Sequence, residues 1–333
     1  MELLKQLCTF SPSGREQGVA ELIRKQVESC CDEMSTDVMG NLIAHKKGNG
    51  PKLMLTAHMD EIGFIVTYIE EKGFLRFAPV GGHEAASIIN QQVQFANGIM
   101  GVIHYDEKTK LSELKMKDCY IDIGVKDRAA AEKLVSVGDM ASFRREMQQC
   151  GDVMMGRALD NKAGCYVLIQ AMQQLKDSKY DVYGVFTVQE EVGLRGARTS
   201  AFAIQPDIAL ALDVTDTGDV PGCDPMAVEL GGGAAIKLKD GGIITHPLVK
   251  RWLMDTAKAK NIPYQLEILR AGSTDVGAIS LSRGGVMCGG ISIPTRYIHT
   301  PNEMAAVADI KHCVALLAAA MQTEFPTQGT NTP

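Results

Sequence analysis

Side chains that could bind metal ions recur at the ends of the predicted strands. Imidazole nitrogens and carboxylate oxygens suit Zn²⁺ or a similar borderline ion. One tetrahedral site needs only four such groups, whereas two ions that share a bridging carboxylate would use them all. In an open α/β sheet, ligands bind just beyond the carboxyl ends of the strands, so these groups are expected to converge. The set comprises His58, Asp60, Asp160, Glu190, Glu191, Asp213 and His299.

Each of these residues also has an ordinary explanation when it is taken alone. A single histidine is more often a core or surface residue, adjacent Glu190 and Glu191 could be solvated charges, and Asp160 could only cap a helix. The metal-site interpretation depends on a coincidence, because several independent strand ends terminate in ligand-type side chains. Spacing alone leaves both interpretations open.

Strand-like and helix-like segments alternate along much of the chain, which predicts a mostly parallel sheet flanked by helices. Near the start, Ser11 or Ser13 is expected to cap a helix that ends near Val27. The expected strands are 52–57, 182–188, 208–212 and 286–293, and the expected helices include one that begins near Asp160, one over 247–259 and an Ala-rich one over 304–321.

The segment 63–153 has a different sequence pattern. It consists of short strand-like stretches broken by glycines, and a helical pattern occurs only over 127–134. It predicts a small β-rich domain inserted into the α/β domain. The α/β domain is then discontinuous, built from 1–62 and 154–325, and the polar segment 326–333 is expected to be a disordered tail. A chain of 333 residues is near the upper size for one core, which agrees with two domains.

Composition excludes several other classes of protein. With 45% hydrophobic residues the chain is too apolar for a disordered protein, and no uninterrupted apolar stretch approaches the roughly 20 residues of a membrane helix. The formal net charge of −6 argues against a nucleic-acid surface. The nine cysteines form no C-x-x-C pair, and the N-terminus shows no secretion signal, so a reducing, cytoplasmic location is expected.

The longer motifs around these candidate residues identify a protein family more specifically than the single residues do. These motifs are 57–64 (AHMDEIGF), 156–164 (GRALDNKAG), 189–197 (QEEVGLRGA), 212–215 (LDVT), 271–275 (AGSTD) and 292–301 (SIPTRYIHTP). With them the chain closely resembles the tetrahedral (TET) metallo-aminopeptidases, the family of deblocking and glutamyl aminopeptidases sometimes called cellulase or endoglucanase. The resemblance runs from about Leu3 to Met321, with the motifs in the family's order.

This resemblance implies a role for each matching residue. Glu190 matches the general base, and Asp60 matches a carboxylate that can orient the imidazole of His58, two residues away on the same strand face. Gly272, Asp275 and Arg296 are candidates for substrate binding. The implied metal ligands are Asp160 as the bridge, His58 with Asp213 on one ion, and Glu191 with His299 on the other.

The resemblance also implies the activity, the cofactors and the assembly. The expected enzyme has a zinc-exopeptidase-like fold and removes the N-terminal residue from short peptides with a free N-terminus. Two divalent ions per subunit, Zn²⁺ or Co²⁺, would activate a water molecule, and the glutamate base would contribute about 10²–10⁴ in rate. The insert is expected to support a homo-oligomer, a dodecamer built from dimers. No membrane or nucleic-acid partner is expected.

Three alternatives remain at this stage. A glycosidase needs two carboxyl groups about 5–10 Å apart across one bond, but the side chains of adjacent Glu190 and Glu191 diverge in an extended backbone. A non-catalytic assembly protein with structural metals would favour closed, Cys-rich sites, which these residues do not form. A dinuclear deacylase or carboxypeptidase would have the same metal core, and only its substrates would distinguish it.

Overall fold

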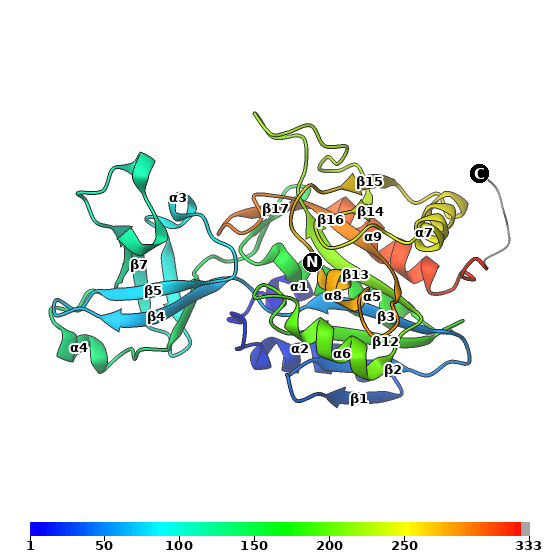
Figure 1. Ribbon diagram of the computed structural model, residues 1–333, viewed down its shortest axis with the longest axis horizontal. Coiled ribbons are helices and arrows are strands. Elements are labelled where there is room, and N and C mark those ends of the chain that lie inside the picture. The colour runs from blue at the N-terminus through cyan, green and yellow to red at the C-terminus, as the bar shows by residue number, and fades with distance from the viewer. Residues whose placement is uncertain (177, 328–333) are drawn as a thin grey trace.

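The chain folds into a large α/β part and a smaller β-barrel that projects from one side of it (Figure 1). The computed structural model describes residues 1–176 and 178–327. The predicted fold, a mostly parallel sheet flanked by helices with an inserted β-rich part, is confirmed.

The large sheet has eleven strands within the described residues, in the order β1-β2-β12-β3-β13-β16-β17-β11-β10, and β14 pairs with β16 and β15. Only β12, β3, β13 and β16 form a continuous parallel centre. The strands are β1 (Glu33–Thr36), β2 (Leu42–Lys46), β3 (Lys52–His58), β10 (Gln148–Cys150), β11 (Val153–Gly156), β12 (Asp181–Thr187), β13 (Ile208–Thr215), β14 (Ala234–Lys239), β15 (Tyr264–Ile268), β16 (Met287–Arg296) and β17 (Glu303–Ala306).

The two faces of this sheet bury two different helix layers. Along β13, Ile208 and Leu210 belong to the larger apolar cluster, whereas Ala209 and Ala211 belong to a smaller one, because successive side chains point to opposite faces. The larger cluster includes α1, α2, α5, α7 and α9, and the smaller one includes α6 and α8. These helices are α1 (Glu2–Leu7), α2 (Gln17–Val27), α5 (Leu159–Gln174), α6 (Arg195–Ile204), α7 (Pro247–Ala259), α8 (Asp275–Ile279) and α9 (Val307–Ala320).

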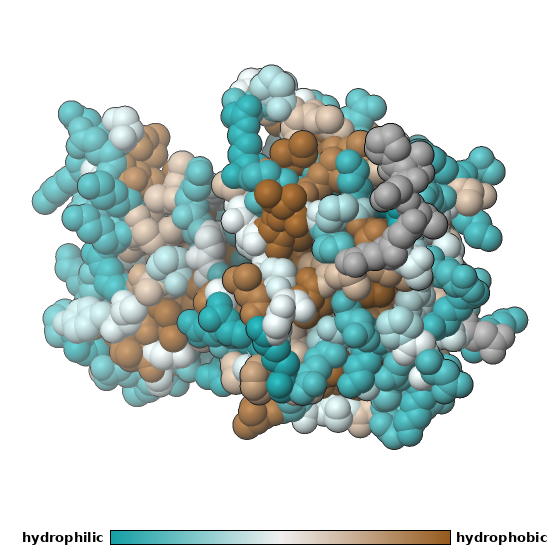
Figure 2. All heavy atoms as spheres, turned by 45° about the vertical axis from the view of Figure 1, so that its right-hand side comes forward, coloured by the Kyte–Doolittle hydropathy of each residue, from teal (hydrophilic) through white to brown (hydrophobic). Residues whose placement is uncertain are grey.

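The smaller part is a closed six-stranded barrel in the order β4-β5-β8-β7-β6-β9, with its own apolar core. Its strands are β4 (Gly63–Ile69), β5 (Leu75–Val80), β6 (Gln92–Phe95), β7 (Met100–Tyr105), β8 (Cys119–Asp122) and β9 (Met140–Phe143). The short helices α3 (Ala85–Ile88) and α4 (Arg128–Glu132) and the 3₁₀ turns Leu111–Glu113 and Met116–Asp118 lie between them. In the space-filling view, the barrel mixes apolar and polar residues on its surface (Figure 2).

Local predictions differ from the structure in a few places. The helix expected over 304–321 begins only at Val307, because Met304–Ala306 belong to β17, which pairs with β11 and β16. Strand pairing here overrides the helix preference of an Ala-rich sequence. The strand β10 lies inside the segment 63–153 but pairs with β11 of the large sheet. Of the expected tail, 328–333 lie outside the described residues.

Two further properties bear on the expected environment. All nine cysteines are free thiols, so none of them forms a disulfide bond. Within the part of the chain that the structure describes, no helix is both long enough and apolar enough to cross a membrane.

Candidate metal centre

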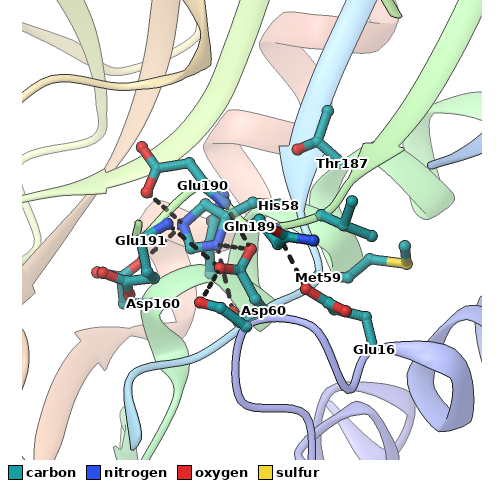
Figure 3. Close-up of polar contacts among 12 residues, drawn as sticks. Glu16, His58, Met59, Asp60, Asp160, Thr187, Gln189, Glu190 and Glu191 are labelled. Carbon is teal, nitrogen blue, oxygen red and sulfur yellow. Dashed lines mark hydrogen bonds and ion pairs between the residues drawn. The ribbon is translucent and has the colours of Figure 1, made fainter. Parts of the chain in front are cut away.

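The predicted ligand residues converge at one edge of the large sheet. His58 ends β3, Asp213 lies near the end of β13, and Glu190 and Glu191 follow β12. The parallel register sets Thr187 beside His58, so the loop after β12 begins next to the imidazole. Figure 3 shows Asp160, Glu190 and Glu191 grouped around His58. These residues line a cleft of about 870 Å³, and His299 and Asp213 line it as well.

Asp160 lies between the two histidines. Its Oδ1 is 3.0 Å from Nε2 of His58, and its Oδ2 is 3.3 Å from Nε2 of His299. A second carboxylate oxygen lies near Nε2 of each imidazole. Oδ1 of Asp213 is 3.6 Å from Nε2 of His58, and Oε2 of Glu191 is 3.2 Å from Nε2 of His299. The arrangement therefore consists of two imidazole–carboxylate pairs joined by one shared carboxylate.

The electrostatics of the site are those of a crowded anionic cluster. Burial raises the pKa of Glu191 to about 6, and the nearby Asp160 charge adds to this effect. Burial alone would lower the pKa of His299, but hydrogen bonds to Asp160 and Glu191 outweigh it and raise that pKa to about 12. Among the described residues, no hydrogen bond or ion pair reaches the buried Oε1 of Glu191. Buried oxygens without partners are costly, and a bound cation would satisfy them.

Glu190 projects into the cleft from the same loop. Its Oε2 is 4.0 Å from Nε2 of His58, and only 9% of the residue is exposed. Burial raises the pKa of this carboxyl well above its usual range, whereas the charge of His58 opposes the shift. A carboxyl group in such a setting can hold a proton near neutral pH.

Asp60 holds the loop that carries the two glutamates. Its Oδ1 accepts the backbone N–H of Glu190 at 3.0 Å, and its Oδ2 accepts that of Glu191 at 3.2 Å. The same Oδ2 accepts a hydrogen bond of 2.6 Å from the hydroxyl of Ser13. Oδ1 also lies 3.4 Å from Nδ1 of His58. Asp60 therefore contacts one ligand-type imidazole and the backbone of two carboxylate residues (Figure 3).

The prediction that Ser11 or Ser13 caps a helix is wrong. The helix α2 begins after Glu16 and has no side-chain cap. Ser13 donates to Asp60 instead, and the hydroxyl of Ser11 accepts a hydrogen bond of 2.8 Å from Nζ of Lys162. Ser13 thus contacts a residue of the site, because the N-terminal segment lies against the loop after β3, where Pro12 forms an isolated bridge with Glu61.

Sequence reasoning missed Glu303, which is buried behind the centre. Its Oε2 accepts the backbone N–H of Asp160 at 2.9 Å, and its Oε1 accepts that of His299 at 3.1 Å. Burial and the charge of Asp160 raise the pKa of Glu303, while the two N–H donors oppose the shift. Acceptance by both oxygens is the geometry of an ionised carboxylate. The only sequence signal was an acidic residue four positions after His299, which is too common to be informative.

Two loops that carry candidate ligands have unusual backbone conformations. Gln189, directly before the two glutamates, has φ 55°, and Tyr297 and His299 have φ 63° and 62°. Such left-handed conformations are unfavourable for residues other than glycine and cluster at functional sites. Here the backbone N–H groups of Glu190, Glu191 and His299 donate hydrogen bonds to the carboxylates of Asp60 and Glu303, which hold both loops in place.

The three candidate substrate-binding residues lie in different settings. Gly272 lines the cleft. Arg296 also lines it, but its guanidinium forms two hydrogen bonds with Asp219, from Nε at 3.0 Å and from a terminal nitrogen at 2.6 Å. Asp275 is 2% exposed and accepts a hydrogen bond of 2.6 Å from the hydroxyl of Thr187, so it lies beneath the cleft wall.

A parallel α/β sheet with imidazoles and carboxylates gathered at its strand ends is typical of enzymes that use divalent metal ions for hydrolysis. Residues 40–316 match the family described as M42 glutamyl aminopeptidase. The chain therefore belongs to the M42 aminopeptidases, which are hydrolases that act on peptides. The resemblance to aminopeptidases seen in the sequence is confirmed.

Individual relatives are similar over almost their whole length. A protein of Acetivibrio thermocellus that is named as an aminopeptidase by assignment is 51% identical to this chain, and the match covers 93% of this chain and 94% of that protein. The lysyl aminopeptidase of Pyrococcus furiosus is 32% identical over 99% of both chains.

Solved structures agree with the fold. An aminopeptidase of Desulfurococcus kamchatkensis has a TM-score of 0.93 at 40% identity, covering 96% of this chain and 94% of its own. The TET1 peptidase of Pyrococcus horikoshii, described as assembling into a tetrahedron or a large octahedral shell, has a TM-score of 0.88 at 29% identity, covering 96% and 98%.

Proposed function

We propose that this chain is a dinuclear metal-dependent aminopeptidase that hydrolyses the N-terminal residue from short peptides. The main support is the position of Asp160, whose two carboxylate oxygens face different imidazoles at 3.0 Å and 3.3 Å. A carboxylate in that position can bridge two ions, whereas a single mononuclear site would leave one of the two imidazole–carboxylate pairs without a role.

The donor atoms suit two divalent ions. His58 and Asp213 would hold one ion, Glu191 and His299 the other, and Asp160 would be shared by both. Nitrogen and carboxylate donors without thiolates fit Zn²⁺ or Co²⁺. Bound there, such ions would act as Lewis acids on the scissile carbonyl and lower the pKa of a water molecule.

Glu190 is the proposed general base. It is nearly buried, lines the cleft and has a raised pKa, so it can take a proton from water and later deliver it to the leaving amine. Asp60 is proposed to act through its neighbours, because it fixes the backbone of Glu190 and Glu191 and faces the imidazole of His58. Gly272 is retained as a proposed substrate contact in the cleft wall.

The substitution Glu190→Gln tests this assignment. We expect the variant to bind as much metal as the wild type but to lose turnover by about 10²–10⁴, because the amide has the same shape and cannot accept the proton. Metal content measured on the same samples separates loss of the base from loss of the ions. Near-normal turnover in a metal-loaded Glu190→Gln variant would remove Glu190 from this role.

Substrate panels test the reaction class. Peptides with a free N-terminus should be cleaved one residue at a time, whereas the same peptides with an acetylated N-terminus should be resistant. Preferential cleavage of the acetylated peptides would favour a deacylase, and cleavage from the C-terminus would favour a carboxypeptidase. Release of reducing sugar from a glucan by metal-free protein would favour a glycosidase.

Self-association is proposed as a second property. The relative from Pyrococcus horikoshii is described as assembling into a tetrahedron or a large octahedral shell, and this chain has a separate barrel in addition to its α/β part. A dodecamer built from dimers would sediment as a species of about twelve times the 36.0 kDa chain mass. A purely monomeric protein in analytical ultracentrifugation at micromolar concentration would contradict this proposal.

A further inference from the structure

The cleft next to the candidate metal centre contains one carboxylate that has no partner. Asp216 follows β13, has an exposed side chain and lines the same cleft as His299. Within the described parts of the chain, no hydrogen bond or ion pair reaches its carboxylate. By contrast, the carboxylates of Asp160, Glu191 and Asp213 each lie within 4 Å of an imidazole. Asp216 is therefore available to a ligand.

The two arginines of the cleft wall are each paired with an aspartate. Arg296 is held in a two-point contact by Asp219, which also accepts the backbone N–H of Leu230 at 3.0 Å. Arg270 lies 2.5 Å from a carboxylate oxygen of Asp224. Each guanidinium thus already faces one carboxylate, whereas no Lys or Arg of the described residues pairs with Asp216, so the wall carries an unbalanced negative charge that favours a positive ligand.

Much of the remaining cleft wall is apolar. Val220, Pro225, Met226 and Leu269 all line the cleft. A long aliphatic stem that ends in a charged head suits such a surface, because the methylene groups can cover apolar side chains while the head reaches a carboxylate. Lysine and arginine side chains have this character, whereas a glutamate side chain would bring a second negative charge towards Asp216.

We propose that Asp216 makes this enzyme prefer peptides whose first residue is basic, through an ion pair with the side chain of that residue. The inference rests on the proposed aminopeptidase function. Membership of the family leaves this preference open, because the family name refers to a glutamyl enzyme and one relative is a lysyl enzyme.

Three p-nitroanilide substrates test the proposal on the metal-loaded enzyme. Lysyl and norleucyl substrates share the same four-carbon stem and differ in the terminal ammonium, and the glutamyl substrate has the opposite charge. We expect kcat/KM to fall in the order lysyl, norleucyl, glutamyl. In Asp216→Asn the lysyl-to-norleucyl ratio should fall about fivefold, as expected for one solvent-accessible ion pair, with norleucyl hydrolysis unchanged. Asp216→Glu should largely restore the ratio.

Asp255→Asn is the matched control, because it makes the same charge change at an exposed aspartate of α7 that does not line the cleft. This control should leave the lysyl-to-norleucyl ratio within about twofold of the wild type. Free lysine should also inhibit norleucyl hydrolysis by the wild type more strongly than free norleucine or glutamate, which requires no variant.

Different outcomes overturn different claims. A wild-type preference for the glutamyl substrate would overturn the assignment of Asp216. An equal loss on all three substrates in Asp216→Asn would also overturn it, since the carboxylate would then meet the α-ammonium group that they share. Failure of the metal-loaded wild type to cleave any of the three would overturn the aminopeptidase proposal itself.

Discussion

The substitution Glu303→Gln tests whether this carboxylate positions Asp160 and His299 in the proposed metal centre. Its two carboxylate oxygens accept the backbone N–H groups of Asp160 and His299, which come from different segments and face each other across the centre. Glu303→Gln keeps the size of the side chain but replaces one acceptor oxygen with an NH₂ donor. One of the two backbone N–H groups would then face another donor, and its hydrogen bond would be lost.

The magnitude follows from the geometry. A hydrogen bond to a charged acceptor contributes about 1.5–3 kcal/mol, and Glu303 is only 2% exposed, so water cannot readily replace the lost bond. Loss of residues that orient metal ligands typically costs about 10–100-fold in metal affinity. We therefore expect Glu303→Gln to bind the divalent ions 10–100-fold more weakly than the wild type while still reaching full occupancy at high metal concentration.

Calorimetric titration of metal-free protein with Co²⁺ measures this affinity directly. Glu132→Gln, an exposed glutamate on the barrel helix α4, is the matched control and should titrate like the wild type. Thermal unfolding of the metal-free proteins reports the loss of the hydrogen bond separately. Wild-type Co²⁺ affinity in Glu303→Gln would refute the idea that this carboxylate positions Asp160 and His299.

Three other perturbations have expected outcomes. Chelation should abolish peptidase activity and added Zn²⁺ or Co²⁺ should restore it; unchanged activity after verified metal removal would refute the metal mechanism. Ser13→Ala removes the 2.6 Å hydrogen bond to Asp60 and should lower the free energy of unfolding by about 1.5–3 kcal/mol, measured by denaturant titration. Gly164→Ala would place a Cβ atom 2.2 Å from Oδ1 of Asn161 and 2.4 Å from the carbonyl oxygen of Leu212, so a large drop in melting temperature is expected, and a wild-type value would contradict this packing.

The convergence of the candidate ligands could be anticipated from the sequence because parallel strands share one edge. Once 52–57 and 208–212 are recognised as buried strands, the side chains that follow them must lie at the same end of the sheet. No comparable rule brings Glu303 to this edge. Its position depends on the antiparallel pairing of β17 with β11 and β16, and the expected helix over 304–321 concealed that pairing.

The settings of Arg296 and Ser13 show a second limit of sequence reasoning. Arg296 is a plausible anchor for an acidic group in the sequence, but its guanidinium is taken by Asp219, which lies 77 positions away in the chain. Ser13 has the residue type and spacing of a helix cap, yet its hydroxyl is directed to Asp60. In both cases a loop conformation selects the partner, and local patterns contain no information about a contact between distant loops.

Asp60 and Glu303 also show why acidic residues near a metal centre should not all be counted as ligands. Both carboxylates use each of their oxygens to accept a backbone N–H group of a residue proposed as a ligand or as the general base. Holding a backbone N–H fixes the position of the whole residue, and the side chain then reaches the centre from a defined point. If the proposed dinuclear centre is correct, variants of such positioning residues should weaken metal binding yet keep two ions at saturation, whereas removal of a proposed ligand such as Asp213 should reduce the stoichiometry. Metal content measured at saturating Co²⁺ therefore separates the two groups, and a stoichiometry below two in Glu303→Gln would place Glu303 among the ligands.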